Sequence, residues 1–233
     1  MRQTKLFIAG DSTAASYPPE QAPMAGWGQL LCTLFDARQV LVCNEAKCGR
    51  SSRSFIAEGY FDRIRERIGA GDYLFIQFGH NDQKPGGGFT DPSGSYPETL
   101  ARYAAMARDQ GAVPVLLTPV ERRHFDAEGR LLETHGDYPE AVRRLARELD
   151  VPLIDLCLSS RALYESLGPE ASKGLFVWLE PGEHPNYPDG VHDNTHFNER
   201  GAREIARLAA DGIAAADVPL KHALLPAGHI QTS

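Results

Sequence analysis

Five short apolar runs, separated by segments with helical periodicity, constrain the fold of this 233-residue chain more than any other feature. The runs are rich in β-branched or aromatic residues, which is typical of buried strands. They cover Leu6–Ala9, Val40–Cys43, Tyr73–Phe78, Val113–Thr118 and Pro152–Leu156. Strands that alternate with helices are joined by right-handed crossovers, so the sheet is expected to be parallel and covered by helices on both faces.

The segments between these runs carry apolar residues three and four positions apart, the spacing of a helix face. The predicted helices are Trp27–Phe35, one or two within Ser51–Ile68, Glu98–Gln110, Tyr138–Leu149 and Asn198–Ala216. Two stretches rich in Gly, Pro, Asn or Asp break the pattern, Pro85–Pro97 and Glu180–Thr195, and are expected to be loops. Long loops within a compact domain are usually functional. Because we find no repeat or linker, we expect one α/β domain over residues 1–233.

Charge and composition exclude several classes of partner. The formal net charge is −7 and no basic run is present, which argues against nucleic acid or an anionic membrane surface. No apolar run is long enough to cross a bilayer, and the first strand begins without a preceding apolar leader, so a cytoplasmic protein is expected. The four cysteines lack Cys-x-x-Cys or zinc spacing, which predicts reduced, mostly buried thiols. The sequence does not indicate an oligomeric state.

Polar residues follow the predicted strands at their carboxyl ends, where open α/β sheets bind ligands. Ser12 comes directly after Gly10, and a tight turn there would present both its hydroxyl and its N–H to a substrate; alternatively, Asp11 or Ser12 caps the next helix. After the second strand, Gly49 allows close approach of the backbone, and its N–H is suited to face an anion. A plain turn is the alternative for Gly49.

The third and fourth strands also end in polar residues. Asn81 offers a side-chain NH₂ donor that suits an oxyanion, whereas Asp82 is expected to tie down its loop. His80 is expected either to touch substrate or to bond a backbone carbonyl. Arg122 and Arg123 would form a guanidinium fork for a substrate carboxylate, or an ion pair that braces the loop.

A histidine just before the last helix is the candidate general base. His196 has Asp193 three residues earlier, close enough on one loop turn to accept from its Nδ1–H and leave Nε2 free to take a proton from Ser12. The main alternative is a metal site from His184, His192, Asp193 and His196. It lacks the His-Glu-x-x-His helix, and the nearby proline and glycine disfavour helical geometry, so we expect no metal.

Together these segments resemble the SGNH (GDSL-type) hydrolase family. Its four blocks occur in order as Gly10-Asp11-Ser12, Gly49, Gly79-His80-Asn81-Asp82 and Asp193-Asn194-Thr195-His196. The chain is most similar to the rhamnogalacturonan acetylesterase group of carbohydrate esterases. That similarity rests on four segments, Gly10–Ala14, Gln77–Asp82, Thr118–Val120 with the two arginines, and Pro185–Gly190 running into Asp193–Phe197.

The resemblance implies a three-layer α/β/α flavodoxin-like fold with a five-stranded parallel sheet in the order 2-1-3-4-5. It implies a serine esterase that removes acetyl groups from pectic oligosaccharides without a cofactor. Ser12, Asp193 and His196 would form its catalytic triad, and Ser12, Gly49 and Asn81 its oxyanion hole. The candidate substrate-binding residues are His80, Arg122, Arg123 and His192. Alternatives are an acetyl esterase acting on xylan, mannan or other acylated sugars, a lipase or thioesterase, and a non-catalytic carbohydrate-binding protein on the same fold.

Overall fold

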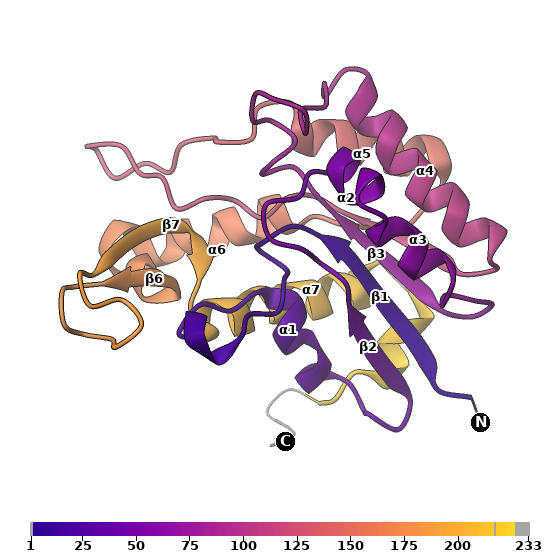
Figure 1. The fold of residues 1–233 in the computed structure, drawn as a ribbon, viewed down its shortest axis with the longest axis horizontal. Coiled ribbons are helices and arrows are strands. Elements are labelled where there is room, and N and C mark those ends of the chain that lie inside the picture. Colours follow the sequence, from indigo (N-terminus) through magenta and orange to yellow (C-terminus); the bar gives the residue numbers. More distant parts are fainter. Residues whose placement is uncertain (1, 217, 227–233) are drawn as a thin grey trace.

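The predicted parallel sheet forms the centre of the protein. The structure is a computed structural model that describes residues 2–216 and 218–226. The sheet strands are β1 (Thr4–Gly10), β2 (Val40–Asn44), β3 (Tyr73–Gln77), β4 (Val113–Leu117) and β5 (Leu153–Ile154). Each pairs in parallel with its neighbour in the order β2-β1-β3-β4-β5, which confirms the predicted topology. Figure 1 shows β2, β1 and β3 side by side.

Helices cover both faces of the sheet, and the alternation of side chains along β1 shows how. Leu6 and Ile8 belong to one buried apolar cluster, and Phe7 and Ala9 belong to the other. The first cluster is completed by α1 (Trp27–Leu30), α6 (Leu156–Ala171) and α7 (Glu199–Ala215). The second is completed by α2 (Ser52–Ala57), α3 (Tyr60–Arg65), α4 (Ser95–Asp109) and α5 (Tyr138–Leu149). The result is the expected three-layer α/β/α arrangement.

Several element boundaries differ from the prediction. The helix α6 was not predicted, although Asp155 accepts from the Leu158 amide at 3.1 Å as its N-cap. The helix α4 begins at Ser95, so the predicted loop Pro85–Pro97 is three residues too long. Pro97 lies in the first turn of α4, where its missing N–H costs no helical hydrogen bond. The first predicted helix continues past α1 as a 3₁₀ turn, Leu31–Leu34.

An antiparallel hairpin replaces part of the second predicted loop. It consists of β6 (Phe176–Leu179) and β7 (Val191–Phe197), so the expectation of a loop over Glu180–Thr195 is wrong for its last five residues. The ring of Phe197 lies 5.1 Å from that of Phe176, and both are buried in the first cluster. This packing fixes the hairpin against the main body (orange in Figure 1).

Three 3₁₀ turns complete the described chain, Pro19–Gln21, Ser172–Leu175 and Pro219–Ala223. Within residues 2–216 and 218–226, no helix combines the length and the apolar character needed to cross a membrane.

All four cysteines are free thiols, but Cys32 and Cys48 are exposed and only Cys157 is buried. The prediction of mostly buried thiols is therefore wrong.

Candidate active site

Ser12 lies in a tight turn directly after β1, at the carboxyl edge of the sheet. The turn is held by the Asp11 carboxylate, which accepts from the Thr13 amide at 2.9 Å and from the Thr13 hydroxyl at 2.8 Å. The Tyr17 hydroxyl donates to the Ser12 carbonyl at 2.7 Å. Ser12 itself is buried in this turn, with 8% of its surface exposed.

His196 is brought to this turn by the hairpin. The Ala25 amide donates to the Phe197 carbonyl at 2.9 Å, and Met24 forms a β-bridge with Asn198. These contacts tie the end of β7 to the segment that follows the Ser12 turn. As a result, His196 Nε2 lies 3.0 Å from Ser12 Oγ, although the two residues are 184 positions apart.

Asp193 orients His196 from the other side of the imidazole ring. Its Oδ2 lies 2.7 Å from His196 Nδ1, and its Oδ1 accepts from the amides of Thr195 at 2.6 Å and His196 at 2.9 Å. Burial alone would raise the pKa of Asp193. The hydrogen bond and charge of His196, together with the two amides, outweigh burial and hold this pKa below its ordinary value. The carboxylate is therefore ionised at neutral pH and fixes the Nδ1–H tautomer of His196.

Asn81 and Gly49 lie on the loops that follow β3 and β2. Asn81 is 8% exposed, and its Nδ2 donates to the Arg50 carbonyl at 3.1 Å, which leaves the second hydrogen of that NH₂ group available. Gly49 has φ +76°, and a Cβ there would meet nothing within 4 Å, so the backbone conformation rather than space requires glycine. In the described part of the chain, no hydrogen bond is donated by the amides of Ser12 or Gly49.

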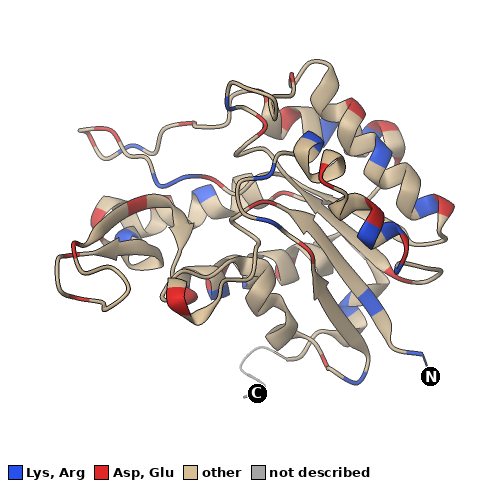
Figure 2. Cartoon of the chain, viewed as in Figure 1, with Lys and Arg blue, Asp and Glu red and all other residues tan. Residues whose placement is uncertain are grey.

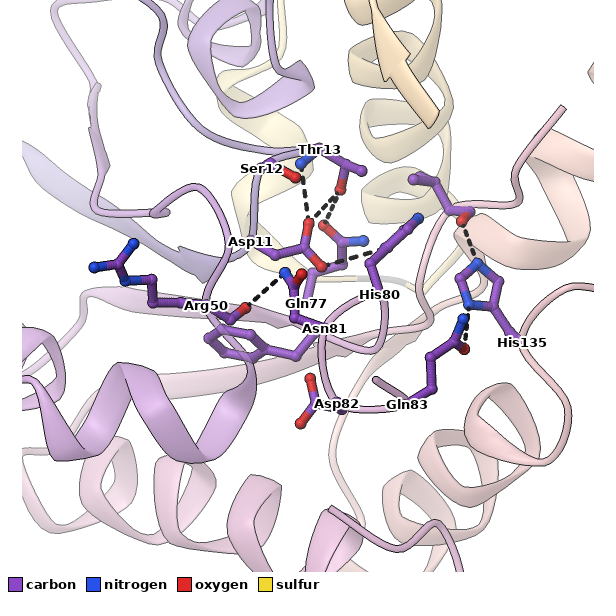
Figure 3. A network of polar contacts seen from close by, with 12 residues as sticks. Asp11, Ser12, Thr13, Arg50, Gln77, His80, Asn81, Asp82, Gln83 and His135 are labelled. Carbon is purple, nitrogen blue, oxygen red and sulfur yellow. Dashed lines mark hydrogen bonds and ion pairs between the residues drawn. The ribbon is translucent and has the colours of Figure 1, made fainter. Parts of the chain in front are cut away.

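His80 is buried behind the Ser12 turn rather than exposed to a ligand. Its Nδ1 lies 3.2 Å from Asp11 Oδ2, and its ring makes an edge contact with His135 at 4.6 Å (Figure 3). Burial lowers the pKa of His80, and the charge and hydrogen bond of Asp11 oppose this effect only in part. The expectation that His80 bonds a backbone carbonyl through its side chain is wrong, because its partner is a carboxylate. The Asp11–His80 contact connects the loop after β1 to the loop after β3.

Asp82 has the structural role that its position predicts. It accepts from the Ser52 amide at 3.0 Å and from the Thr90 hydroxyl at 2.8 Å, at the start of α2. Burial raises the pKa of Asp82 to about 6, because these neutral donors only partly replace water. In the same loop, Gly79 has φ +146°, and a Cβ there would lie 2.9 Å from the Pro119 side chain. Glycine therefore allows the loops after β3 and β4 to pack together.

The two arginines after β4 have different surroundings. Arg123 is 6% exposed and donates to Ser172 Oγ at 3.1 Å, to Asn194 Oδ1 at 2.7 Å and to the Pro169 carbonyl. All of these acceptors are neutral, so the expected ion pair is wrong, and the contacts favour a brace between the hairpin and α6 over a substrate contact. Arg122 is only partly buried and donates to the carbonyls of Thr134 at 3.2 Å and His80 at 3.4 Å.

The remaining candidates lie apart from the Ser12–His196 contact. His192 stacks on Trp178 at 4.4 Å and pairs with Glu180 at 3.1 Å, on an exposed face of the hairpin. His184 Nδ1 accepts from the Asn186 amide at 3.1 Å. Among the residues that the structure describes, no three His, Cys, Asp or Glu side chains are grouped so that they could hold a metal ion. Of the four residues of the alternative metal site, Asp193 and His196 contact each other, whereas His184 and His192 have partners outside the set.

The charged side chains are mixed in sign over the molecule (Figure 2).

Two residues of the site were not singled out from the sequence. The sequence indicates Asp11 as a helix cap and as a member of the Gly10-Asp11-Ser12 block, with no role of its own at the site, and it gives no indication for Tyr17. The contact of Asp11 with Thr13 and that of Tyr17 with Ser12 both depend on the geometry of the turn. The sequence carries no signal for this geometry beyond the short polar run after β1.

Comparison with known proteins places the chain in a family. Residues 8–204 match the GDSL-like Lipase/Acylhydrolase family, and the chain belongs to it; it is an esterase. It is 54% identical to rhamnogalacturonan acetylesterase RhgT of Bacillus subtilis over 95% of this chain and 94% of that protein. It is 37% identical to the probable rhamnogalacturonan acetylesterase YesY of the same organism, over 94% and 97% of the two chains.

Solved structures show the same fold. The crystal structure of the Bacillus subtilis protein YXIM superposes with a TM-score of 0.80 at 30% identity, over 94% of this chain and 58% of that chain. Axe2, an acetyl-xylooligosaccharide esterase from Geobacillus, has a TM-score of 0.64 at 18% identity, over 90% and 94% of the chains. At that identity the likeness to Axe2 concerns the fold alone.

Proposed function

We propose that this protein is a serine esterase that removes acetyl groups from rhamnogalacturonan-type pectic oligosaccharides. The observation that carries the proposal is the chain of contacts from Ser12 Oγ through His196 to Asp193, at 3.0 and 2.7 Å. It has the order and geometry of a nucleophile, its base and the group that orients the base. The substrate class comes from the relative that is 54% identical and named a rhamnogalacturonan acetylesterase.

In the proposed first step, Ser12 Oγ attacks the acetyl carbonyl carbon while His196 Nε2 takes the hydroxyl proton. Asp193 stabilises the imidazolium that forms. When the tetrahedral intermediate collapses, the bond to the sugar oxygen breaks and His196 returns the proton to the leaving alcohol. The acetyl group then remains on Ser12.

In the second step, a water molecule attacks the acetyl-enzyme, and His196 takes one of its protons and passes it to Ser12 Oγ. The bond between the acetyl carbon and Ser12 Oγ breaks, acetic acid leaves and ionises to acetate, and the serine is restored. In both steps the carbonyl oxygen becomes negative, and the N–H groups of Ser12 and Gly49 and the Asn81 NH₂ group are proposed to hold it. The proposed steps use no metal or cofactor. Cytoplasmic action on imported oligosaccharides stays a prediction.

The test measures acetate release from acetylated rhamnogalacturonan oligosaccharides by NMR, beside acetylated xylan and mannan oligosaccharides. We expect the highest kcat/KM on the pectic substrate and loss of activity on every substrate in Ser12→Ala. A preference for xylan or mannan would reject the substrate class and keep the reaction. Activity retained in Ser12→Ala would reject the serine mechanism.

A further inference from the structure

Arg50 holds the peptide group that precedes Gly49. Its Nη1 donates to the Cys48 carbonyl at 2.8 Å, and this carbonyl belongs to the same peptide unit as the Gly49 N–H. In a trans peptide the C=O and N–H point in opposite directions. A cation fixed on the Cys48 oxygen therefore fixes the direction of the Gly49 N–H.

Arg50 is itself anchored and reaches the second donor as well. Its Nε and Nη2 both donate to Glu58 Oε2, at 2.9 and 2.7 Å. Its own main-chain carbonyl accepts from Asn81 Nδ2 at 3.1 Å (Figure 3). One residue thus contacts both groups that are proposed to complete the oxyanion hole with Ser12.

Lys84 holds the opposite end of the Asn81 amide. Its Nζ donates to Asn81 Oδ1 at 2.9 Å. An ammonium group can only donate hydrogen bonds, so it can pair with the oxygen of the amide and not with the NH₂ group. Oδ1 must therefore face Lys84, while the NH₂ group faces Arg50 and the site. The two amide donors therefore share one feature: each has a cation bonded to its oxygen.

We propose that Arg50 and Lys84 are positioning residues that orient and polarise the Gly49 and Asn81 donors of the oxyanion hole. This inference rests on the proposed function, because it assumes that these groups face the oxyanion. Hydrogen bonding to an amide oxygen polarises the amide and makes its N–H a stronger donor, and the effect is larger when the partner is charged. Arg50 contacts the oxygen side of the peptide between Cys48 and Gly49, and Lys84 contacts the oxygen side of the Asn81 amide, so each positive charge lies opposite the donating N–H.

The proposal predicts an effect on kcat without an effect on KM, because donors of this kind bind most strongly once the carbonyl oxygen is charged. With p-nitrophenyl acetate, Lys84→Met should lower kcat about threefold to fivefold, the range of exposed charge interactions, and Lys84→Arg should restore most of it. Arg50→Met should lower kcat about tenfold, with partial recovery in Arg50→Lys.

Matched controls separate these effects from the loss of a surface cation. Lys5 donates to the Arg67 carbonyl at 3.3 Å from the far end of β1, and Arg108 donates to the Leu149 carbonyl at 2.6 Å from the end of α4. Lys5→Met and Arg108→Met remove the same charges at a distance from the site. They should leave kcat unchanged.

A double substitution tests whether Lys84 acts through Asn81, and it does not depend on the stability of the Arg50 variants. In the Asn81→Ala background, Lys84→Met should cause no further loss of kcat. A full additional loss there, or a Lys84→Met effect on KM alone, would overturn the inference. If Ser12→Ala is inactive while Lys84→Met has wild-type kcat, only this inference fails. If Ser12→Ala stays active, the proposed function fails instead.

Discussion

Replacing Asp193 by asparagine should stop catalysis by reversing the tautomer of His196. The structure determines which way the new amide would face. Asp193 Oδ1 accepts from two main-chain amides, at 2.6 and 2.9 Å, and only an oxygen can keep these bonds. The asparagine NH₂ group would therefore occupy the position of Oδ2, 2.7 Å from His196 Nδ1.

An NH₂ group in that position donates to Nδ1, so the imidazole proton moves to Nε2. Nε2 then donates toward Ser12 Oγ and has no lone pair with which to take the hydroxyl proton. The variant also loses the negative charge that stabilises the imidazolium. In an unrelated serine hydrolase the same change lowers kcat about 10⁴-fold, which corresponds to about 5 kcal/mol of transition-state stabilisation, and we expect a loss of that order here.

The assay is steady-state hydrolysis of p-nitrophenyl acetate, with thermal unfolding measured in parallel. The expected result is a large fall in kcat, little change in KM and a melting temperature close to that of the wild type. Asp189→Asn serves as the matched control, because this carboxylate lies in the same segment and has no contact with His196 in the described chain. Near wild-type turnover in Asp193→Asn would refute the reasoning.

Four further predictions concern other residues at this edge of the sheet. Asn81→Ala should lower kcat about 10²–10³-fold with little change in KM, and a change in KM alone would make Asn81 a sugar contact instead. His80 and Thr13 hold the pKa of Asp11 at about 2 against the effect of burial, so Asp11 should contribute about 2 kcal/mol of stability above pH 4. This stability should be lost as the pH falls toward 2. Denaturant unfolding should therefore show that the free energy of unfolding of Asp11→Asn falls less steeply with acidification than that of the wild type. An equal fall in both proteins would contradict the prediction. Arg123→Met should lower the melting temperature by about 5 °C, because it removes the buried hydrogen bonds of the guanidinium group. Arg122→Met should raise KM for acidic oligosaccharides and leave KM for p-nitrophenyl acetate unchanged. Equal losses on both substrates in Arg122→Met would favour a structural role for that residue too.

The sheet could be predicted from the sequence because its signal is local. Each strand is a short apolar run, and burial on both faces leaves no polar residue to interrupt it, as Leu6–Ala9 shows. The strand order came from the family resemblance. The helix α6 was missed because serines and a Gly168–Pro169 pair interrupt its apolar pattern, and Gly168 has φ +72°.

The hairpin was missed for a different reason. The chain between β6 and β7 is rich in Pro, Gly, Asn and Asp, and β7 itself carries Asp193 and Asn194, which are poor strand formers. Tertiary contacts override this preference, because Phe197 packs in the core and Ala25 pairs with its carbonyl. Sequence reasoning could therefore select Asp193 and His196 by chemistry and could not foresee the strand that carries them.

Three aspartates around the site show why residue type alone does not define a role. Asp82 meets only neutral donors and its pKa is raised to about 6, whereas the pKa of Asp11 is lowered to about 2 beside His80. The pKa of Asp193 is also lowered, and its partner His196 contacts the serine hydroxyl. All three carboxylates anchor loops at the same edge of the sheet. Of the three, Asp193 alone bonds a histidine whose other nitrogen reaches Ser12, so the position of its partner, rather than its own ionisation, suits it to catalysis.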